Sequence, residues 1–352
     1  MVFFSHFAVM FYPAFYWGGT ERSHCNDFDI WIGQTPISFF LNGNSGVMIF
    51  LILTGFGTYM LCCKSMKDCA RYISLRYFKL FILTFIASAS VWLLFKWDLV
   101  FALDIDEELL TPWFGNWNPM EDSYFSLVLQ NPLESLATYN GVLWTMKYMF
   151  VGTIVSVVMY LLSVNCAKPY LVYFLSIVVL VNMKETYYIP CVLGVFLADV
   201  YNNNKSKRIN LPWGIVLAVL GIYLCAYPTG MEPTLPIYSF LPYEYCHYYH
   251  ILGAGSLVYI SLFWPFCVQF LEKKFFQIFG KHSMSIYVLH YGIIISFSAY
   301  LYTKLCDIIS YNITVILIFI FTSCIVMFTS CILSKLVNII FKRLTNTFPI
   351  SP

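Results

Sequence analysis

The chain consists of long apolar runs separated by short polar stretches. A helix needs about 20 apolar residues to cross the roughly 30 Å of hydrocarbon in a bilayer. Lipid leaves open backbone groups unsatisfied, so these runs must be helical. The pattern predicts an all-α integral membrane protein with about ten transmembrane helices in one bundle. The predicted spans are residues 2–17, 44–62, 75–96, 143–163, 169–183, 187–200, 211–228, 249–270, 284–303 and 312–334.

Composition supports a membrane environment. Hydrophobic residues make up 60% of the 352 residues and charged residues 11%, whereas a soluble domain carries about 25% charged residues. The lipid bilayer is therefore an expected partner, and we expect a multi-pass protein of the cell membrane. The net charge of +2 gives no reason to expect a nucleic-acid partner. The twelve cysteines show no paired C-x-x-C spacing, so no metal site is predicted.

The basic residues predict the orientation. If the connection between the second and third spans is cytoplasmic, most of the 20 Lys and Arg residues fall on the cytoplasmic side, which is the usual bias. Both termini are then cytoplasmic, and residues 18–43 and 97–142 are outside. The five basic residues predicted to lie outside are Arg22, Lys96, Lys147, Lys184 and Lys304.

Several segments allow two interpretations. The short spans 169–183 and 187–200 could form one tilted pair or two half-crossings. Residues 97–142 could fold over the outer mouth of the bundle as a functional loop, or form an ordinary cap. No internal repeat of fixed period is visible, which weakens the interpretation as an inverted-repeat transporter.

His6 lies inside the first apolar run. Ionisable groups within a membrane are costly and are candidates for function, and a histidine suits proton transfer near neutral pH. A neutral imidazole that is hydrogen-bonded to a neighbouring helix explains the residue equally well. His250, near the outer end of its span, is more easily explained as structural.

A glycine-rich helix leads into a basic segment. Small residues such as Gly46, Gly55 and Gly57 let helix backbones approach closely, or leave room for a ligand. Basic residues follow near the start of the third span, and Arg76 and Lys79 share a helix face at i and i+3. Anchoring at the cytoplasmic surface would explain these charges without any ligand. The basic residues of this segment are Arg71, Arg76 and Lys79.

The ninth predicted span carries a polar stripe. Ser283, Tyr287 and His290 follow one another at i, i+4 and i+7 on an otherwise apolar helix. Polar residues inside a membrane face protein or water rather than lipid. His6 and His290 are expected at similar depths from the cytoplasmic side, which suggests a shared cavity. His282 is expected at the water interface.

The order of these motifs resembles the acyltransferase 3 family of integral-membrane acyltransferases. The resemblance runs from His6 to about Tyr302. It covers the histidine, the glycine-rich stretch from Gly46 to Phe56, the basic pair, Leu143-Trp144-Thr145, and the late stretch from Gly280 to His290. It implies one membrane acyltransferase domain over residues 1–352.

The resemblance also implies roles for individual residues. His6 corresponds to a histidine considered essential for transfer, and His290 to the histidine of the late motif, so both are catalytic candidates. Arg76, Lys79 and Arg71 would bind the phosphates of acyl-coenzyme A. The predicted lining of the cavity comprises Thr54, Tyr287, Ser283 and Trp144.

The chain departs from the family pattern at several places. The family's arginine before the histidine would fall before Met1, so we expect the start of the first helix to be missing. Lys79 replaces an arginine and loses the bidentate fork. Met149 stands where a glutamate is common, so a carboxylate is missing unless Glu185 or another group substitutes.

By implication the protein is an O-acyltransferase, O-acetyl in particular. It would move an acyl group from acyl-coenzyme A, as co-substrate and without further cofactor, to an extracytoplasmic carbohydrate such as a surface polysaccharide. Trp113, Trp117 and Trp144 would suit a sugar-binding mouth. The alternative is a degenerate family member or a transporter that binds acyl donor or sugar without turnover. Met149 favours the alternative, and the pair of histidines opposes it.

Overall fold

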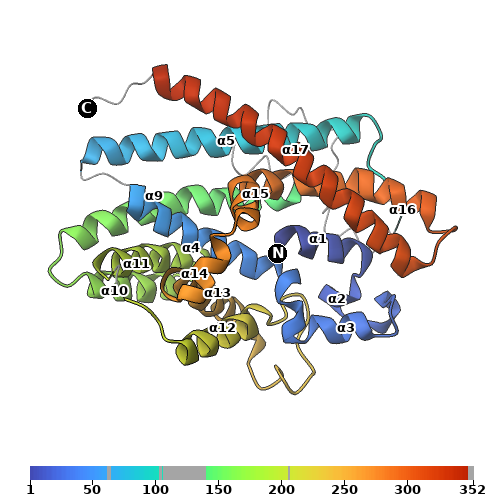
Figure 1. Cartoon of the computed structure of the whole chain (residues 1–352), viewed down its shortest axis with the longest axis horizontal. Coiled ribbons are helices and arrows are strands. Elements are labelled where there is room, and N and C mark those ends of the chain that lie inside the picture. The colour runs from blue at the N-terminus through green and yellow to red at the C-terminus, as the bar shows by residue number, and fades with distance from the viewer. Residues whose placement is uncertain (62–64, 103–104, 106–139, 205–206, 348–352) are drawn as a thin grey trace. The chain divides into compact units, whose positions relative to one another are not determined.

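The computed structural model describes residues 1–61, 65–102, 105, 140–204 and 207–347. These residues form helices and loops, without a strand. Contacts divide the chain into two units, which are residues 1–76 with 148–277 (unit 1) and residues 77–147 with 278–352 (unit 2). The prediction of a single domain over the whole chain stays a prediction. Figure 1 labels the helices.

Each of the ten predicted apolar runs contains helix, but fewer qualify as membrane spans. By length and composition five described helices can cross a membrane, or six if one bent pair counts as a span. The prediction of about ten transmembrane helices is therefore not confirmed. The five are α4 (Gly43–Leu61), α5 (Met66–Lys96), η5 with α9 (Gly141–Trp144 and Thr145–Val164), α15 to α16 (Lys274–Ile293, Ile294–Ser298 and Ala299–Leu305) and α17 (Tyr311–Thr347).

The remaining elements are shorter. The first predicted span is two helices, α1 (Val2–Phe11) and α2 (Ala14–Trp17). Two further short elements, α3 (Phe28–Gly33) and η2 (Pro36–Leu41), precede α4. The predicted short pair is α10 (Pro169–Asn182) and α11 (Ile189–Asn203). Then follow α12 (Leu211–Cys225), α13 (Cys246–Phe263) and α14 (Pro265–Leu271).

Prolines interrupt two of the predicted spans. The residue before a proline is disfavoured in the helical region, and Trp264, before Pro265, has φ −95 and ψ 111. The chain consequently bends by 88° between α13 and α14. Tyr12, before Pro13, has φ −136 and ψ 65, and α1 ends there.

Two other helices begin earlier than predicted. α5 starts at Met66 rather than residue 75, and α15 starts at Lys274 rather than residue 284. The added turns mix charged and polar residues with apolar ones, so they interrupt the apolar run without preventing helix formation. The apolar run marks the part of a helix that can enter lipid, and it does not mark where helical hydrogen bonding begins.

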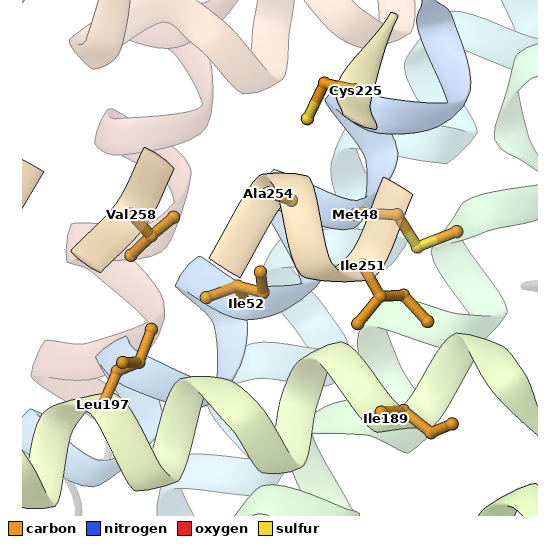
Figure 2. Packing of buried hydrophobic residues seen from close by; sticks show 8 residues of the cluster. All are labelled: Met48, Ile52, Ile189, Leu197, Cys225, Ile251, Ala254 and Val258. Carbon is orange, nitrogen blue, oxygen red and sulfur yellow. The ribbon is translucent and has the colours of Figure 1, made fainter. Parts of the chain in front are cut away.

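The core of unit 1 lies between α4, α11 and α13. Figure 2 shows its buried side chains from these helices and the end of α12. α4 and α11 cross closely, because a Cβ at Gly55 would lie 2.0 Å from Cys191 O and one at Gly194 would lie 2.0 Å from Ile52 O. The cluster comprises Met48, Ile52, Ile189, Leu197, Cys225, Ile251, Ala254 and Val258.

In unit 2, α17 runs along the helix that contains α15 and α16. Ser298 Oγ lies 2.7 Å from Thr322 Oγ1. Farther along α17, His282 Nδ1 lies 2.9 Å from Ser334 Oγ. His282 is 8% exposed, so its prediction as a solvated interface residue is wrong. α15 begins about three turns before residue 284, which places His282 within a helix that α17 covers.

Candidate functional site

His6 lies on a helix that packs against the beginning of α4. A Cβ at Gly43 would lie 2.9 Å from Ser5 Oγ, and one at Gly46 would lie 3.0 Å from Val2 Cγ2. Residues at i, i+3 and i+4 share a helix face, so half-buried His6 lies on or beside the face of α1 that meets α4. His6 therefore lies near the N-terminal end of α4.

Arg76 lies farther inside unit 1 than the sequence suggests. It is half-buried on the third turn of α5, and its Nε is buried without a hydrogen-bond partner in the described residues. Its electrostatic neighbours include Tyr72 and Cys191. Cys191 is fully buried and contacts α4 at Gly55, so Arg76 lies at the level of the middle of α4.

The other two basic candidates have different surroundings. Lys79 Nζ lies 5.8 Å from the centroid of the Phe341 ring on α17, within unit 2. Arg71 is half-buried on α5, five residues before Arg76. Arg76 and Lys79 share a helix face, as the spacing predicted, but the contacts that the structure gives them fall in different units.

The Leu143-Trp144-Thr145 motif and the late motif meet in unit 2. Tyr287 Oη donates to Val142 O at 2.6 Å and lies 2.7 Å from Thr145 Oγ1. Because the tyrosine proton goes to the carbonyl, the threonine donates to the tyrosine. Asn140 Nδ2 adds a 3.0 Å bond to Val288 O. The buried Tyr287 hydroxyl thus joins η5 and α9 to α15.

His290 is fully buried and has a defined tautomer. Its Nδ1 lies 3.1 Å from Ile286 O, and a carbonyl can only accept, so Nδ1 carries the proton. The basic nitrogen of the neutral imidazole is then Nε2. His290 lies four residues before η8 (Ile294–Ser298), a π-helical turn, and such turns are frequent at functional sites.

The model of the acyltransferase 3 family, described as an acyltransferase domain, matches residues 1–335. The chain belongs to the acyltransferase 3 family. Comparison with curated proteins and with solved structures gives no match. The chain is therefore a multi-pass membrane acyltransferase, which acts on an acyl donor and an acceptor and transfers a group other than an aminoacyl group. Family membership favours the enzyme over the transporter interpretation.

The remaining site candidates of the acyltransferase lie in varied environments. Thr54 is buried and donates to Phe50 O at 2.9 Å, and partly exposed Ser283 donates to Gly280 O at 2.9 Å. Both hydroxyl protons therefore go to their own helices. Trp144 is 38% exposed. Trp113 and Trp117 lie outside the described residues.

Met149 is buried at 4% exposure on α9. The acyltransferase thus has an apolar side chain where the family commonly has a carboxylate. Glu185, the suggested substitute, is exposed between α10 and η6 (Thr186–Tyr188). The structure therefore gives no support for Glu185 as a buried replacement.

The sequence analysis did not predict a polar cluster that the structure places at the beginning of α4. Asn44 Nδ2 lies 3.2 Å from His247 Nδ1 and 2.7 Å from His250 Nδ1. His250 is fully buried, and its Nε2 lies 2.8 Å from Tyr227 O; its structural role stays a prediction. Two sequence signals could have found the cluster. They are the Asn42-Gly43-Asn44 start of the glycine-rich helix and the i, i+3 spacing of His247 and His250.

The loop after α12 supports this cluster. Asn42 Nδ2 donates to Tyr227 O at 2.9 Å, and Ser45 Oγ donates to Cys225 O at 2.7 Å. Tyr238 Oη donates to Tyr223 O at 2.7 Å, and burial raises the pKa of this phenol. These hydrogen bonds fix the carbonyls at the end of α12 and at the start of the loop against the start of α4.

Proposed function

We propose that this acyltransferase moves an acetyl group from acetyl-coenzyme A to a hydroxyl of an extracytoplasmic carbohydrate, and that it works in the cell membrane. The observation that carries the donor assignment is Arg76, whose guanidinium has a buried Nε without a hydrogen-bond partner in the described residues. Leaving such a group unpaired is costly. A ligand that supplies acceptor oxygens would remove that cost.

Coenzyme A offers suitable acceptors, because it carries phosphate groups and guanidinium groups bind phosphate through paired hydrogen bonds. Arg71 and Lys79 would add charge along the approach to Arg76 on α5. The predicted cytoplasmic position of this end of α5 agrees with a donor that arrives from the cytoplasm.

The proposed reaction begins when a histidine nitrogen removes the proton of the acceptor hydroxyl. The hydroxyl oxygen then attacks the thioester carbon, the carbon–sulfur bond breaks, and the thiolate of coenzyme A takes the proton. His6 is the first candidate for this base, acting directly or by relaying the acyl group. His290 is the second candidate, because its neutral tautomer has its basic nitrogen at Nε2.

A carbohydrate acceptor outside the cytoplasm rests on the family resemblance and on the predicted outer segments. These segments are acidic and rich in aromatic residues, including Trp113 and Trp117. Aromatic rings with a few polar groups suit a neutral, hydroxyl-rich ligand. A surface polysaccharide is the expected class.

Binding of acetyl-coenzyme A by the purified protein in nanodiscs tests the donor. Arg76→Ala should weaken binding roughly 10- to 100-fold, since a hydrogen bond to a charged group contributes about 1.5–3 kcal/mol. Lys67→Ala is the matched control, because Lys67 is an exposed cation at the start of the same helix. Equal affinity of the Arg76→Ala variant and the parent would show that Arg76 only anchors α5.

Mass spectrometry of surface glycans tests the acceptor. Cells with the gene should carry O-acetyl groups that cells without the gene lack. If the glycans are identical while the purified protein still cleaves acetyl-coenzyme A, the acceptor is not a carbohydrate.

A further inference from the structure

The side-chain amide of Asn44, at the beginning of α4, lies within hydrogen-bond distance of two histidines at the beginning of α13. Nδ2 of Asn44 lies 2.7 Å from Nδ1 of His250 and 3.2 Å from Nδ1 of His247. On its other side, His250 Nε2 lies 2.8 Å from the carbonyl oxygen of Tyr227. These contacts form a chain that begins at a backbone carbonyl and ends at His247.

The carbonyl fixes the proton positions along this chain. Tyr227 O can only accept, so His250 Nε2 carries a proton, and the neutral ring must accept at Nδ1. Asn44 Nδ2 therefore donates one hydrogen to His250 and the other to His247 Nδ1. The neutral His247 ring must then carry its proton at Nε2. Asn42 Nδ2, 3.4 Å from His250 Nε2, is a second donor to the same carbonyl.

The opposite orientation of the Asn44 amide is unfavourable. It would present Oδ1 to both rings, and His250 would then need protons on both nitrogens. His250 is fully buried, and burying a charge without an opposite charge is costly. The orientation that leaves His250 neutral is therefore the stable one.

Two polar atoms of the cluster remain open to a ligand. His247 Nε2 and Asn44 Oδ1 have no hydrogen-bond partner in the part of the chain that the structure describes. Both side chains are half-buried rather than enclosed. One atom is a donor and the other is an acceptor, and the two residues are hydrogen-bonded to each other. Because Nε2 lies on the side of the ring away from Asn44, the two atoms would bind two different groups. A sugar offers several hydroxyls, each of which can accept or donate.

A row of aromatic rings extends from His247. The ring of Tyr187 lies 5.5 Å from that of His247 in an edge arrangement, and the ring of Tyr148 lies 4.7 Å from that of Tyr187. Tyr188 adds a third ring, 5.6 Å from Tyr148. All three tyrosines are half-buried, so part of each ring surface is accessible along a row that begins beside His247. Apolar walls with a few oriented polar groups are typical of small-molecule sites.

The cluster lies at the end of α4 that also meets α1. Gly43 and Gly46 contact α1, and Asn44 lies between them in the sequence. His6, the first candidate for the base, is on or beside the contacting face of α1. A sugar bound by Asn44 and His247 would therefore lie at the same end of α4 as His6.

We propose that Asn44, His247, Tyr148 and Tyr187 form the subsite that binds the acceptor. One sugar hydroxyl would accept from His247 Nε2–H, another would donate to Asn44 Oδ1, and a sugar face would lie on the tyrosine rings. This inference rests on the proposed function and adds its acceptor site. His247 is then a hydrogen-bond donor to the acceptor and does not act as the base. His250 and Tyr227 position it.

The first test is the tautomer of His247 in the full-length protein, measured by ¹⁵N NMR of the histidine side chains and assigned with the His247→Gln variant. The expected proton is on Nε2. A proton on Nδ1 would overturn the proposal, because Asn44 would then not donate to this ring. This measurement needs no acceptor.

The second test separates acceptor from donor. The readouts are glycan O-acetylation in cells, by mass spectrometry, and binding of acetyl-coenzyme A to the purified variants. His247→Phe keeps the ring and removes the donor, so it should lower acylation at least tenfold while donor affinity stays within twofold. Tyr187→Leu should act in the same way, whereas Tyr187→Phe keeps the ring and should stay near the parent.

Two controls define the outcome. Tyr249→Phe, on the same helix, removes only a 3.2 Å bond to Pro242 O and should change neither readout. His247→Gln retains an amide donor and should recover part of the acylation if His247→Phe folds poorly. Parental acylation by His247→Phe, or an equal loss of donor affinity, would overturn the acceptor subsite. Failure of the parent itself to bind acetyl-coenzyme A would instead refute the proposed function.

Discussion

The two candidates for the catalytic base, His6 and His290, differ in their surroundings. His6 is half-buried on α1 beside α4, and His290 is fully buried with its proton on Nδ1. His6 belongs to unit 1 and His290 to unit 2. Their meeting in a shared cavity stays a prediction.

Replacing His6 distinguishes the two candidates. His6→Gln keeps hydrogen bonding but cannot accept a proton at neutral pH. We expect the transfer rate to fall about 10²–10⁴-fold, which is the usual contribution of a positioned base, while acetyl-coenzyme A still binds. Initial rates are measured together with monodispersity in detergent, which controls for folding. A rate near that of the parent would transfer the role of base to His290.

Tyr287 is predicted from the structure to support the fold rather than to touch substrate. Tyr287→Phe leaves Val142 O and Thr145 Oγ1 without their partner, and each unsatisfied buried group costs about 1–3 kcal/mol. We expect a lower Tm in detergent with acetyl-coenzyme A affinity retained. An unchanged Tm combined with loss of transfer would show that the hydroxyl acts on the substrate.

At the scale of helices, glycines decide how closely α4 can approach α11. Gly55→Ala would place a Cβ 2.0 Å from Cys191 O, and a backbone atom of a packed helix cannot move aside cheaply. We expect a loss of more than about 1–3 kcal/mol, the usual cost of overpacking, seen as a lower Tm or lost expression.

Gly57→Ala is the matched control for this crossing. A Cβ at Gly57 would meet nothing within 4 Å, and alanine favours a helix over glycine by about 1 kcal/mol. Its stability should hold or rise. Equal destabilisation by both substitutions would mean that helix crossing is not the cause.

The sequence predicted the positions of the helices better than the residues at which they begin and end. Apolar runs locate the parts that can enter lipid, so α4 was predicted closely. The helical turns before residue 75 and before residue 284 contain charged and polar residues that interrupt the apolar runs, and they were therefore missed. Pro13 and Pro265 are visible in the sequence, but a proline can kink a span or end it, and the neighbouring helices decide between these outcomes.

The candidate site was predictable residue by residue but not contact by contact. Family resemblance identified Tyr287 and Trp144, yet the bond of Tyr287 to Thr145 joins positions 142 residues apart. The burial of Arg76 depends on α11, which no local pattern reveals. The Asn44 and His247 pair likewise comes together only through the packing of α4 and α13.

For the whole molecule, the main prediction is topology. The charge distribution predicts that residues 205–208 are cytoplasmic and that the loop between α12 and α13 is outside. Lys207→Cys should therefore react with a membrane-impermeant thiol reagent only after cells are opened. Glu232→Cys, exposed in the loop between α12 and α13, should react in intact cells. Labelling of position 207 from outside would reverse the orientation.

The length of α4 has a consequence for the shape of the donor. Gly46 meets α1 near the proposed acceptor subsite, and Gly55 meets Cys191 near Arg76. These nine residues correspond to roughly 14 Å of helix at about 1.5 Å per residue, close to half of the roughly 30 Å hydrocarbon core. A donor held by its phosphates at Arg76 must therefore carry its thioester on a long, slender arm. Coenzyme A has such an arm, and a short acyl phosphate would be too small to reach.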